Sequence, residues 1–325
     1  MKRTIASLLL LSALAFQPAS ARLNVVTTTE DLADMARQVG GGHVSASSLV
    51  TGVRDPHSLD ARPGFMSRVR NADLFIAVGL DLEIGYERAI LQGSGNRRVQ
   101  IGASGHLYAS EGVAVLEKPA SVSRAQGDIH PHGNPHVWLD PFNVRVMATN
   151  IANAMVRLDP QNANSYLQNL SRFLARIDAS MFGEALVQKY GAQKLWDMST
   201  EGDLVSRLRA AGDSSRLGGW AAKMAPHAGK PIVSYHRTWS YFAHRFRLRV
   251  VAELEPKPGI PPTPGHLANV VKTMKSQNVQ VILQEPYFSS NAAKSVASQA
   301  GARVVVAPPS VGADRAATSY IAMID

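Results

Sequence analysis

The sequence predicts an α/β protein with two small parallel-sheet α/β lobes joined by one long helix. Short runs of β-branched residues alternate with helical patterns along most of the chain, which is typical of βαβ units and parallel sheets. The chain of 325 residues is too long for one ordinary hydrophobic core, so two domains are expected. An amphipathic pattern over residues 162–190 separates the two alternating halves and predicts a linking helix about 40 Å long.

The N-terminal lobe is expected over residues 22–161. Thr29 or Glu30 begins its first helix, and a run of glycines ends that helix. The predicted strands lie at 23–29, 44–50, 73–79 and 97–103. The predicted helices lie at 30–40, 66–72, 81–91 and 141–158. Residues 103–135 are rich in Gly, Ser and Pro and predict a loop, in which 113–117 is a candidate short strand.

The C-terminal lobe is expected over residues 191–325, with a similar layout but no sequence repeat. Thr263 and Pro264 fit the N-cap and the first position of a helix. The predicted strands lie at 230–236, 249–255, 279–285 and 302–308. The predicted helices lie at 238–246, 266–277 and 289–301.

The first 21 residues predict a secretory signal peptide. Lys2 and Arg3 precede a short apolar run, and Ala19 and Ala21 frame a small-residue cleavage site. We therefore expect export and cleavage after Ala21. The apolar run is too short to cross a membrane as a stable helix.

Composition narrows the class of protein further. The sequence contains no cysteine, which excludes disulfides and thiolate zinc sites and removes the residue on which a bacterial lipid anchor is built. The formal net charge is +9, but Arg and Lys are scattered, so a nucleic-acid partner is not expected. We expect a soluble protein of the periplasm with no lipid anchor.

Four polar residues follow predicted strands or turn-rich segments in the two halves of the chain, and they are His57, His136, His236 and Glu285. In open α/β sheets ligands bind outside the carboxyl ends of the strands. Three imidazoles and a carboxylate gathered there would suit a tetrahedral zinc ion. Position alone leaves two alternatives open, a metal site and ordinary hydrogen-bonded histidines.

A family resemblance rests on segments that run over nearly the whole mature chain, namely DPHSLDARP, ADLFIAVGLDLE, GNPHVWLDP, SYHRTWSYFAHRF, ELEPKPGIPPTPGHL and VILQEPYF. In this order they resemble the periplasmic zinc- and manganese-binding solute-binding proteins of ABC importers. The resemblance implies two lobes around a metal cleft, with His57, His136 and His236 as ligands. Manganese members typically carry a carboxylate at the third position, so His236 favours Zn²⁺ and makes Mn²⁺ less expected.

The fourth ligand departs from the family pattern. Many members carry an aspartate shortly after the last strand, where this chain reads VVVAPPSVGADR. Glu285 is the candidate substitute, and Asp60 and a bound water are the alternatives.

His130 and His132 precede the third segment in a turn-rich stretch. The resemblance implies a loop that captures or hands over metal, and a solvated polar loop is the alternative. Neither histidine is expected to be a direct ligand.

The predicted function is the capture of a divalent transition metal, foremost Zn²⁺, and its delivery to an inner-membrane ABC permease and its ATPase by a monomeric protein. A manganese- or iron-binding member of the same family is the first alternative. A zinc hydrolase is the second, although the sequence offers no HExxH motif and no general base among the histidines. An adhesin or a metal-storage protein is the third.

Overall fold

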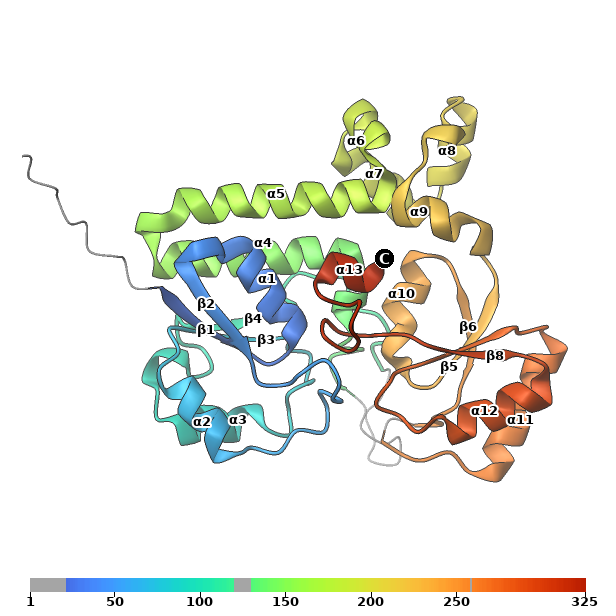
Figure 1. Cartoon of the computed structure of the whole chain (residues 1–325), viewed down its shortest axis with the longest axis horizontal. Helices are drawn as coiled ribbons and strands as arrows, with labels where there is room; N and C mark the ends of the chain where they lie inside the picture. The colour runs from blue at the N-terminus through green and yellow to red at the C-terminus, as the bar shows by residue number, and fades with distance from the viewer. Residues whose placement is uncertain (1–21, 120–129, 258) are drawn as a thin grey trace, which may run out of the picture.

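The structure is a computed structural model that describes residues 22–119, 130–257 and 259–325. Figure 1 shows two lobes side by side, with a long helix that runs above the first lobe and ends near the second. Each lobe contains a four-stranded parallel sheet, which confirms the predicted α/β class. The predicted signal peptide lies outside the described residues. Among the described residues, no helix has the length and apolar content needed to cross a membrane.

The N-terminal sheet has the strand order β2-β1-β3-β4. Its strands are β1 (Leu23–Thr27), β2 (Val44–Ser48), β3 (Leu74–Ala77) and β4 (His106–Tyr108). The helices of this half are α1 (Glu30–Gly40), α2 (Pro63–Arg70), α3 (Glu87–Ser94) and α4 (Pro141–Leu158). Helices α1 and α4 lie on one side of the sheet and α2 and α3 on the other (Figure 1). The last strand was predicted at 97–103, but that segment contains the short 3₁₀-helix η2 (Arg97–Val99) and a turn.

The C-terminal sheet has the order β6-β5-β7-β8, which is the same topology counted from its own first strand. Its strands are β5 (Pro231–Ser234), β6 (Arg249–Glu253), β7 (Val281–Gln284) and β8 (Arg303–Val306). Its helices are α10 (Ser240–Arg245), α11 (Pro264–Ser276) and α12 (Ser290–Ala300). The side chain of Thr263 accepts a hydrogen bond from the backbone N–H of His266 and caps α11, as predicted.

The long joining helix is confirmed but is shorter than expected. Helix α5 (Ala163–Phe182) has 20 residues, which corresponds to about 30 Å. It ends at Gly183, whose φ of 83° favours glycine. A Cβ atom on Gly183 would lie 3.0 Å from the Cα atom of Gly218, so this close approach also requires glycine. The lobe boundaries themselves stay predictions.

Four short helices follow α5, and α6 and α8 project from its C-terminal end away from the lobes (Figure 1). Helix α6 (Glu184–Tyr190) lies within the stretch predicted as one long helix, whereas α7 (Ala192–Glu201), α8 (Leu204–Ala210) and α9 (Gly219–Met224) were not predicted. Further 3₁₀-helices are η1 (Gly41–His43), η5 (Pro160–Asn162), η6 (Ser214–Arg216) and η7 (Ala225–His227).

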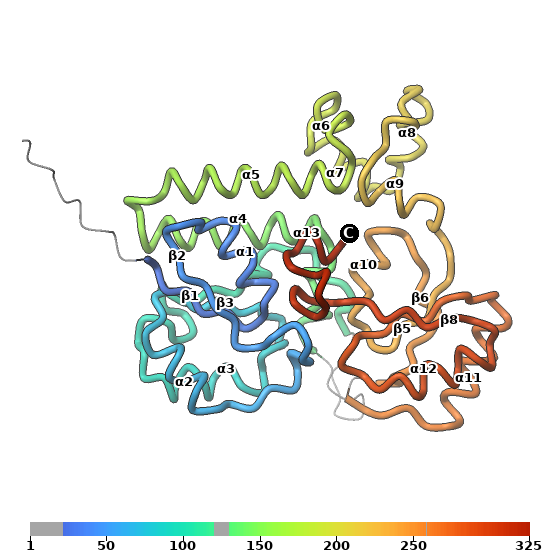
Figure 2. Tube along the Cα trace, in the orientation of Figure 1, coloured from blue at the N-terminus to red at the C-terminus, as the bar shows by residue number. Residues whose placement is uncertain are grey.

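The C-terminal segment returns from β8 to the first lobe, as the red trace of Figure 2 shows, and ends in α13 (Tyr320–Ile324). Asp31 on α1 accepts hydrogen bonds from the hydroxyl of Ser310 and the backbone N–H of Val311. Asp34 accepts one from the backbone N–H of Tyr320. The two lobes are therefore joined by this segment as well as by α5.

Candidate metal centre

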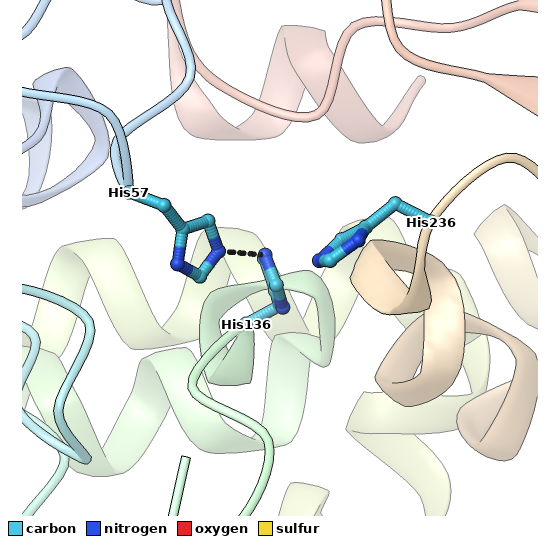
Figure 3. A group of neighbouring side chains, drawn as sticks. All are labelled: His57, His136 and His236. Carbon is cyan, nitrogen blue, oxygen red and sulfur yellow. Dashed lines mark hydrogen bonds between the residues drawn. The ribbon is translucent and has the colours of Figure 1, made fainter. Parts of the chain in front are cut away.

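Three histidines from distant parts of the chain come together between the lobes (Figure 3). His57 lies in the loop between β2 and α2, and His136 directly precedes the 3₁₀-helix η4 (Val137–Leu139). His236 follows β5 and precedes the 3₁₀-helix η8 (Arg237–Trp239). His57 and His236 thus sit past the carboxyl ends of strands, the position expected for a ligand site in this class of fold.

The spacing of the three imidazoles fits one metal ion. One ligand nitrogen from each ring lies within 4.8 Å of the others. The Nε2 atoms of His57 and His136 are 3.1 Å apart. Two nitrogens each bonded to a tetrahedral zinc ion are about 3.3 Å apart, since Zn–N bonds are about 2.0–2.1 Å long. The donor set of three imidazole nitrogens suits zinc and other later transition metals.

His136 is held by the amide of Asn134. The Oδ1 atom of Asn134 lies 2.8 Å from Nδ1 of His136 and accepts a hydrogen bond of 3.0 Å from its backbone N–H. An Nδ1–H donated to this oxygen leaves the lone pair on Nε2, which faces His57. Burial, followed by the neighbouring imidazoles, holds the pKa of His136 well below its usual value, so the neutral form that can bind a metal is favoured.

His236 is held by a carboxylate. Its Nδ1 contacts Glu255, whose other oxygen accepts a 3.0 Å hydrogen bond from the backbone N–H of Gly259. Burial lowers the pKa of His236, but the hydrogen bond and the charge of Glu255 outweigh it, and the pKa is raised. Carboxylate partners of this kind orient a ligating imidazole and increase its basicity.

His57 is the least buried of the three. Its backbone N–H donates a 2.9 Å hydrogen bond to Asp55, and burial followed by the positive charge of His236 and His130 lowers the pKa of its ring. A cavity of about 260 Å³ opens beside His57 and His236 on the side of the second lobe. At about 30 Å³ per water, this space can accommodate an ion with several water molecules.

The partners of the ligand histidines were not identified from the sequence. Asp140, which lies close to His136 in the chain, does not hold an imidazole, because it pairs through both carboxylate oxygens with Arg245 at 2.7 and 2.8 Å. Asn134 and Glu255 hold the rings instead. Strand β6 ends at Glu253, so Glu255 lies just past the strand end, and a correct strand boundary would have selected it.

Glu285 lies directly after β7 and is fully buried. Neither of its carboxylate oxygens makes a hydrogen bond of ordinary geometry with the residues that the structure describes. Burial raises its pKa to about 7, and the nearby hydroxyl of Thr238 and the charge of His236 oppose this shift only in part. It is not a member of the cluster formed by the three histidines. The side chain of Asp60 is largely exposed and lies 3.5 Å from the guanidinium of Arg62.

His130 and His132, the histidines of the turn-rich stretch before His136, lie in different places. The ring of His130 lies against that of His57, with 4.9 Å between the ring centroids. His132 is exposed, and its Nε2 lies 3.7 Å from a carboxylate oxygen of Asp81 in the first lobe. His130 therefore adjoins the three-histidine cluster, whereas His132 faces another part of the surface.

Comparison with known proteins places this arrangement in one family. A sequence model of the family described as zinc-uptake complex component A, periplasmic (ZnuA), matches residues 25–181 and 218–325. The matched segments form most of the chain and include all three clustered histidines. The unmatched residues between them contain α6, α7 and α8.

The manganese ABC transporter substrate-binding lipoprotein scaA of Streptococcus gordonii is 30% identical over 137 residues, which cover 42% of this chain and 42% of that protein. The zinc-binding protein AdcA of Streptococcus pyogenes serotype M3 is 20% identical over 305 residues, which cover 90% of this chain and 52% of that protein. This chain therefore spans about half or less of the length of these relatives.

A solved structure, the crystal structure of ZnuA, shares the fold with a TM-score of 0.67 and 21% identity, over 92% of this chain and 99% of that one. The names of these similar proteins refer to both zinc and manganese, so they leave the choice of metal open.

Proposed function

This chain belongs to the family of periplasmic zinc-uptake complex component A proteins, and from this premise we propose that it captures Zn²⁺ and delivers it to a membrane permease. It acts as the solute-binding component of a metal ABC importer, in the periplasm, as a monomer, with the permease and its ATPase in the inner membrane. The family consists of transport binding proteins, so no enzymatic step is part of the proposal, and the hydrolase alternative is excluded.

The Nε2 atoms of His57, His136 and His236 are the proposed ligands of the ion. The observation that supports this proposal most strongly is the convergence of three ligand nitrogens within 4.8 Å in a family of metal-binding proteins. Two of the rings have a hydrogen-bond acceptor at Nδ1, which favours the tautomer that leaves Nε2 ready for a metal.

Zinc is proposed over manganese because all three ligands are nitrogens. Manganese prefers oxygen ligands and octahedral geometry, whereas three imidazoles in a compact cluster suit a tetrahedral zinc ion. A manganese- or iron-binding role in the same kind of importer is the alternative.

Glu285 is the proposed fourth ligand, with Asp60 and water as alternatives. A buried carboxylate without hydrogen bonds of ordinary geometry requires a proton or a nearby cation. A metal ion at the histidine cluster would provide such a cation. The exposed position of Asp60 supports it less.

His130 and His132 are proposed to assist metal capture. The contact of His130 with the ring of His57 gives an incoming ion a further nitrogen beside the site. His132, together with Asp81, offers a nitrogen and an oxygen on the exposed surface. Replacement of both His130 and His132 is expected to change the rate of metal uptake more than the equilibrium affinity.

The test is metal binding to purified mature protein stripped with a chelator, with zinc and manganese titrated separately. One tightly bound zinc ion per chain, and much weaker manganese binding, are expected. Tighter binding of manganese would overturn the choice of metal, and the absence of any metal binding would overturn the site. Light scattering of the same samples tests the monomer.

A further inference from the structure

We propose that Asn134 is a positioning residue that fixes His136 to the turn carrying His236 and so favours a small tetrahedral ion over a larger one. The inference rests on the proposed function, because it concerns the geometry of the same metal site. It assigns a role to a side chain that touches only one of the three ligands directly.

Every polar atom of Asn134 is engaged. Its Oδ1 meets Nδ1 and the backbone N–H of His136, and its Nδ2 donates 2.9 Å hydrogen bonds to the backbone carbonyl of Arg237 and to the carboxylate of Glu117. Its backbone N–H donates to the carbonyl of Leu116. Since Arg237 directly follows His236, one amide side chain links the segments of two ligands that are 100 residues apart.

The hydrogen bonds of Asn134 to His136 and to the carbonyl of Arg237 form a junction between the two ligand segments. Tyr241 supports this junction from the second lobe. Its hydroxyl donates a 2.7 Å hydrogen bond to the backbone carbonyl of Asn134 and accepts one of 3.0 Å from the backbone N–H of Leu116. Both side chains are almost fully buried, with 1% exposure for Tyr241 and 6% for Asn134. Buried hydrogen bonds of this kind are costly to break, because each unpaired group would also lack water.

The junction should restrict how far the rings of His136 and His236 can separate. Zinc binds nitrogen at about 2.0–2.1 Å in a tetrahedron, so it fits rings held close together. A larger ion with a preference for octahedral geometry needs a wider arrangement. Loosening the junction is therefore expected to weaken zinc binding more than manganese binding.

Asn134→Asp separates positioning across the cleft from simple orientation of His136. The carboxylate keeps an acceptor for the imidazole but loses both donors, and it faces the carboxylate of Glu117. If Asn134 only oriented His136, the variant would bind zinc as tightly as the wild type or more tightly. Positioning across the cleft instead predicts zinc binding weakened about 10–100-fold, with a smaller ratio of manganese to zinc dissociation constants. Tyr241→Phe, which removes only the hydroxyl, is expected to change the ratio in the same direction but less.

The experiment measures zinc and manganese affinities and the visible spectrum of the Co²⁺-loaded mature protein for both variants. Asn150→Asp is the matched control, because the Asn150 amide likewise donates two hydrogen bonds, both to backbone carbonyls, but lies away from the site. The expected result is a smaller preference for zinc over manganese, together with weaker absorption of the kind typical of tetrahedral Co²⁺. Both changes are expected in the two test variants only.

Wild-type metal preference and Co²⁺ spectrum in Asn134→Asp and Tyr241→Phe would overturn the positioning role. A His136→Ala variant, measured beside them, distinguishes this failure from failure of the proposed function. Loss of zinc binding in His136→Ala leaves the proposed site intact, whereas retained binding there would reject the site itself.

Discussion

The two lobes share one sheet topology but surround their ligand histidines differently. In the first lobe, burial holds the pKa of His57 and His136 well below the usual value, and the acceptor for His136 is the neutral amide of Asn134. In the second lobe, the carboxylate of Glu255 raises the pKa of His236 in spite of burial. The first lobe thus offers imidazoles that favour the neutral form, whereas the second offers one that keeps its proton to a higher pH, so that a metal ion competes there with the proton.

The two sheets also differ in how completely they are covered. All four residues of β3 are buried, and one apolar cluster lies on each face of the N-terminal sheet. The outer strands β6 and β8 of the C-terminal sheet contain only half-buried and exposed residues. Equal topology therefore does not imply equal contributions to stability, because the free energy gained depends on the apolar area removed from water.

The largest expected effect is the loss of zinc affinity when a ligand histidine is removed. The ligands of the two lobes should differ in the proton release that accompanies binding. His136→Ala and His236→Ala should each weaken zinc binding by orders of magnitude, because each removes one of three nitrogen ligands. Only His236→Ala should also abolish most of the proton release that accompanies binding. Zinc competition titrations in buffers of different ionisation enthalpy measure both quantities. His43→Ala, at the opposite end of β2, is the control, and wild-type affinity in either ligand variant would disprove the assignment.

The second prediction compares the last strand of each sheet. Leu107→Ala in β4 should reduce the free energy of unfolding by about 2–5 kcal/mol, because it leaves a cavity in a packed core. Val306→Ala in β8 should change it by less than about 0.5 kcal/mol, because Val306 is 52% exposed. Urea unfolding of the metal-free protein measures both. Equal losses would show that the two sheets are equally important for stability.

The third prediction concerns the pH dependence of zinc binding. The raised pKa of His236 means that the ring is protonated up to a pH above its ordinary value of 6.5, so zinc affinity should fall as the pH falls through that raised pKa. Glu255→Gln should move this fall to lower pH and weaken binding by about 10–100-fold at neutral pH. Affinity titrations between about pH 5 and pH 8 test the shift. An unchanged pH dependence of zinc affinity in this variant would mean that Glu255 does not control the protonation of His236.

The smallest expected effect concerns the contact between Asp31 and the C-terminal segment. Burial raises the pKa of Asp31 to about 7, although hydrogen bonds from Ser310 and Val311 oppose the shift. A carboxyl group whose pKa is raised on folding stabilises the fold at low pH, and that contribution is lost as the pH rises from about 4 to about 7. Asp31→Asn cannot ionise, and it should cost about 1–3 kcal/mol by leaving one donor unpaired.

The stability difference between Asp31→Asn and the wild type should therefore narrow between about pH 5 and pH 8. Urea unfolding at both pH values measures this difference, with the exposed Asp60→Asn as the control. A difference that stays constant would show that Asp31 does not ionise in this range.

Much of the fold could be predicted from local patterns. The predicted bounds of α4 agree with the structure, because Pro141 at the first position and regular apolar spacing define this helix locally. The pattern over 162–190 predicted one helix, but the helix ends at Gly183 and a second helix begins at Glu184. Apolar spacing continues past this glycine, so the break depends on the contact with Gly218, which lies far along the chain.

The sequence by itself determined the alternation of strands and helices and the three histidines, since periodicity and motif spacing are properties of neighbouring residues. Only the tertiary structure decided that Asn134 and Glu255 hold two of those rings, and that Glu285 lies outside their cluster. The reason is physical. Asn134 bonds to a carbonyl 103 residues away, and such a pairing depends on how two lobes pack rather than on any local sequence signal.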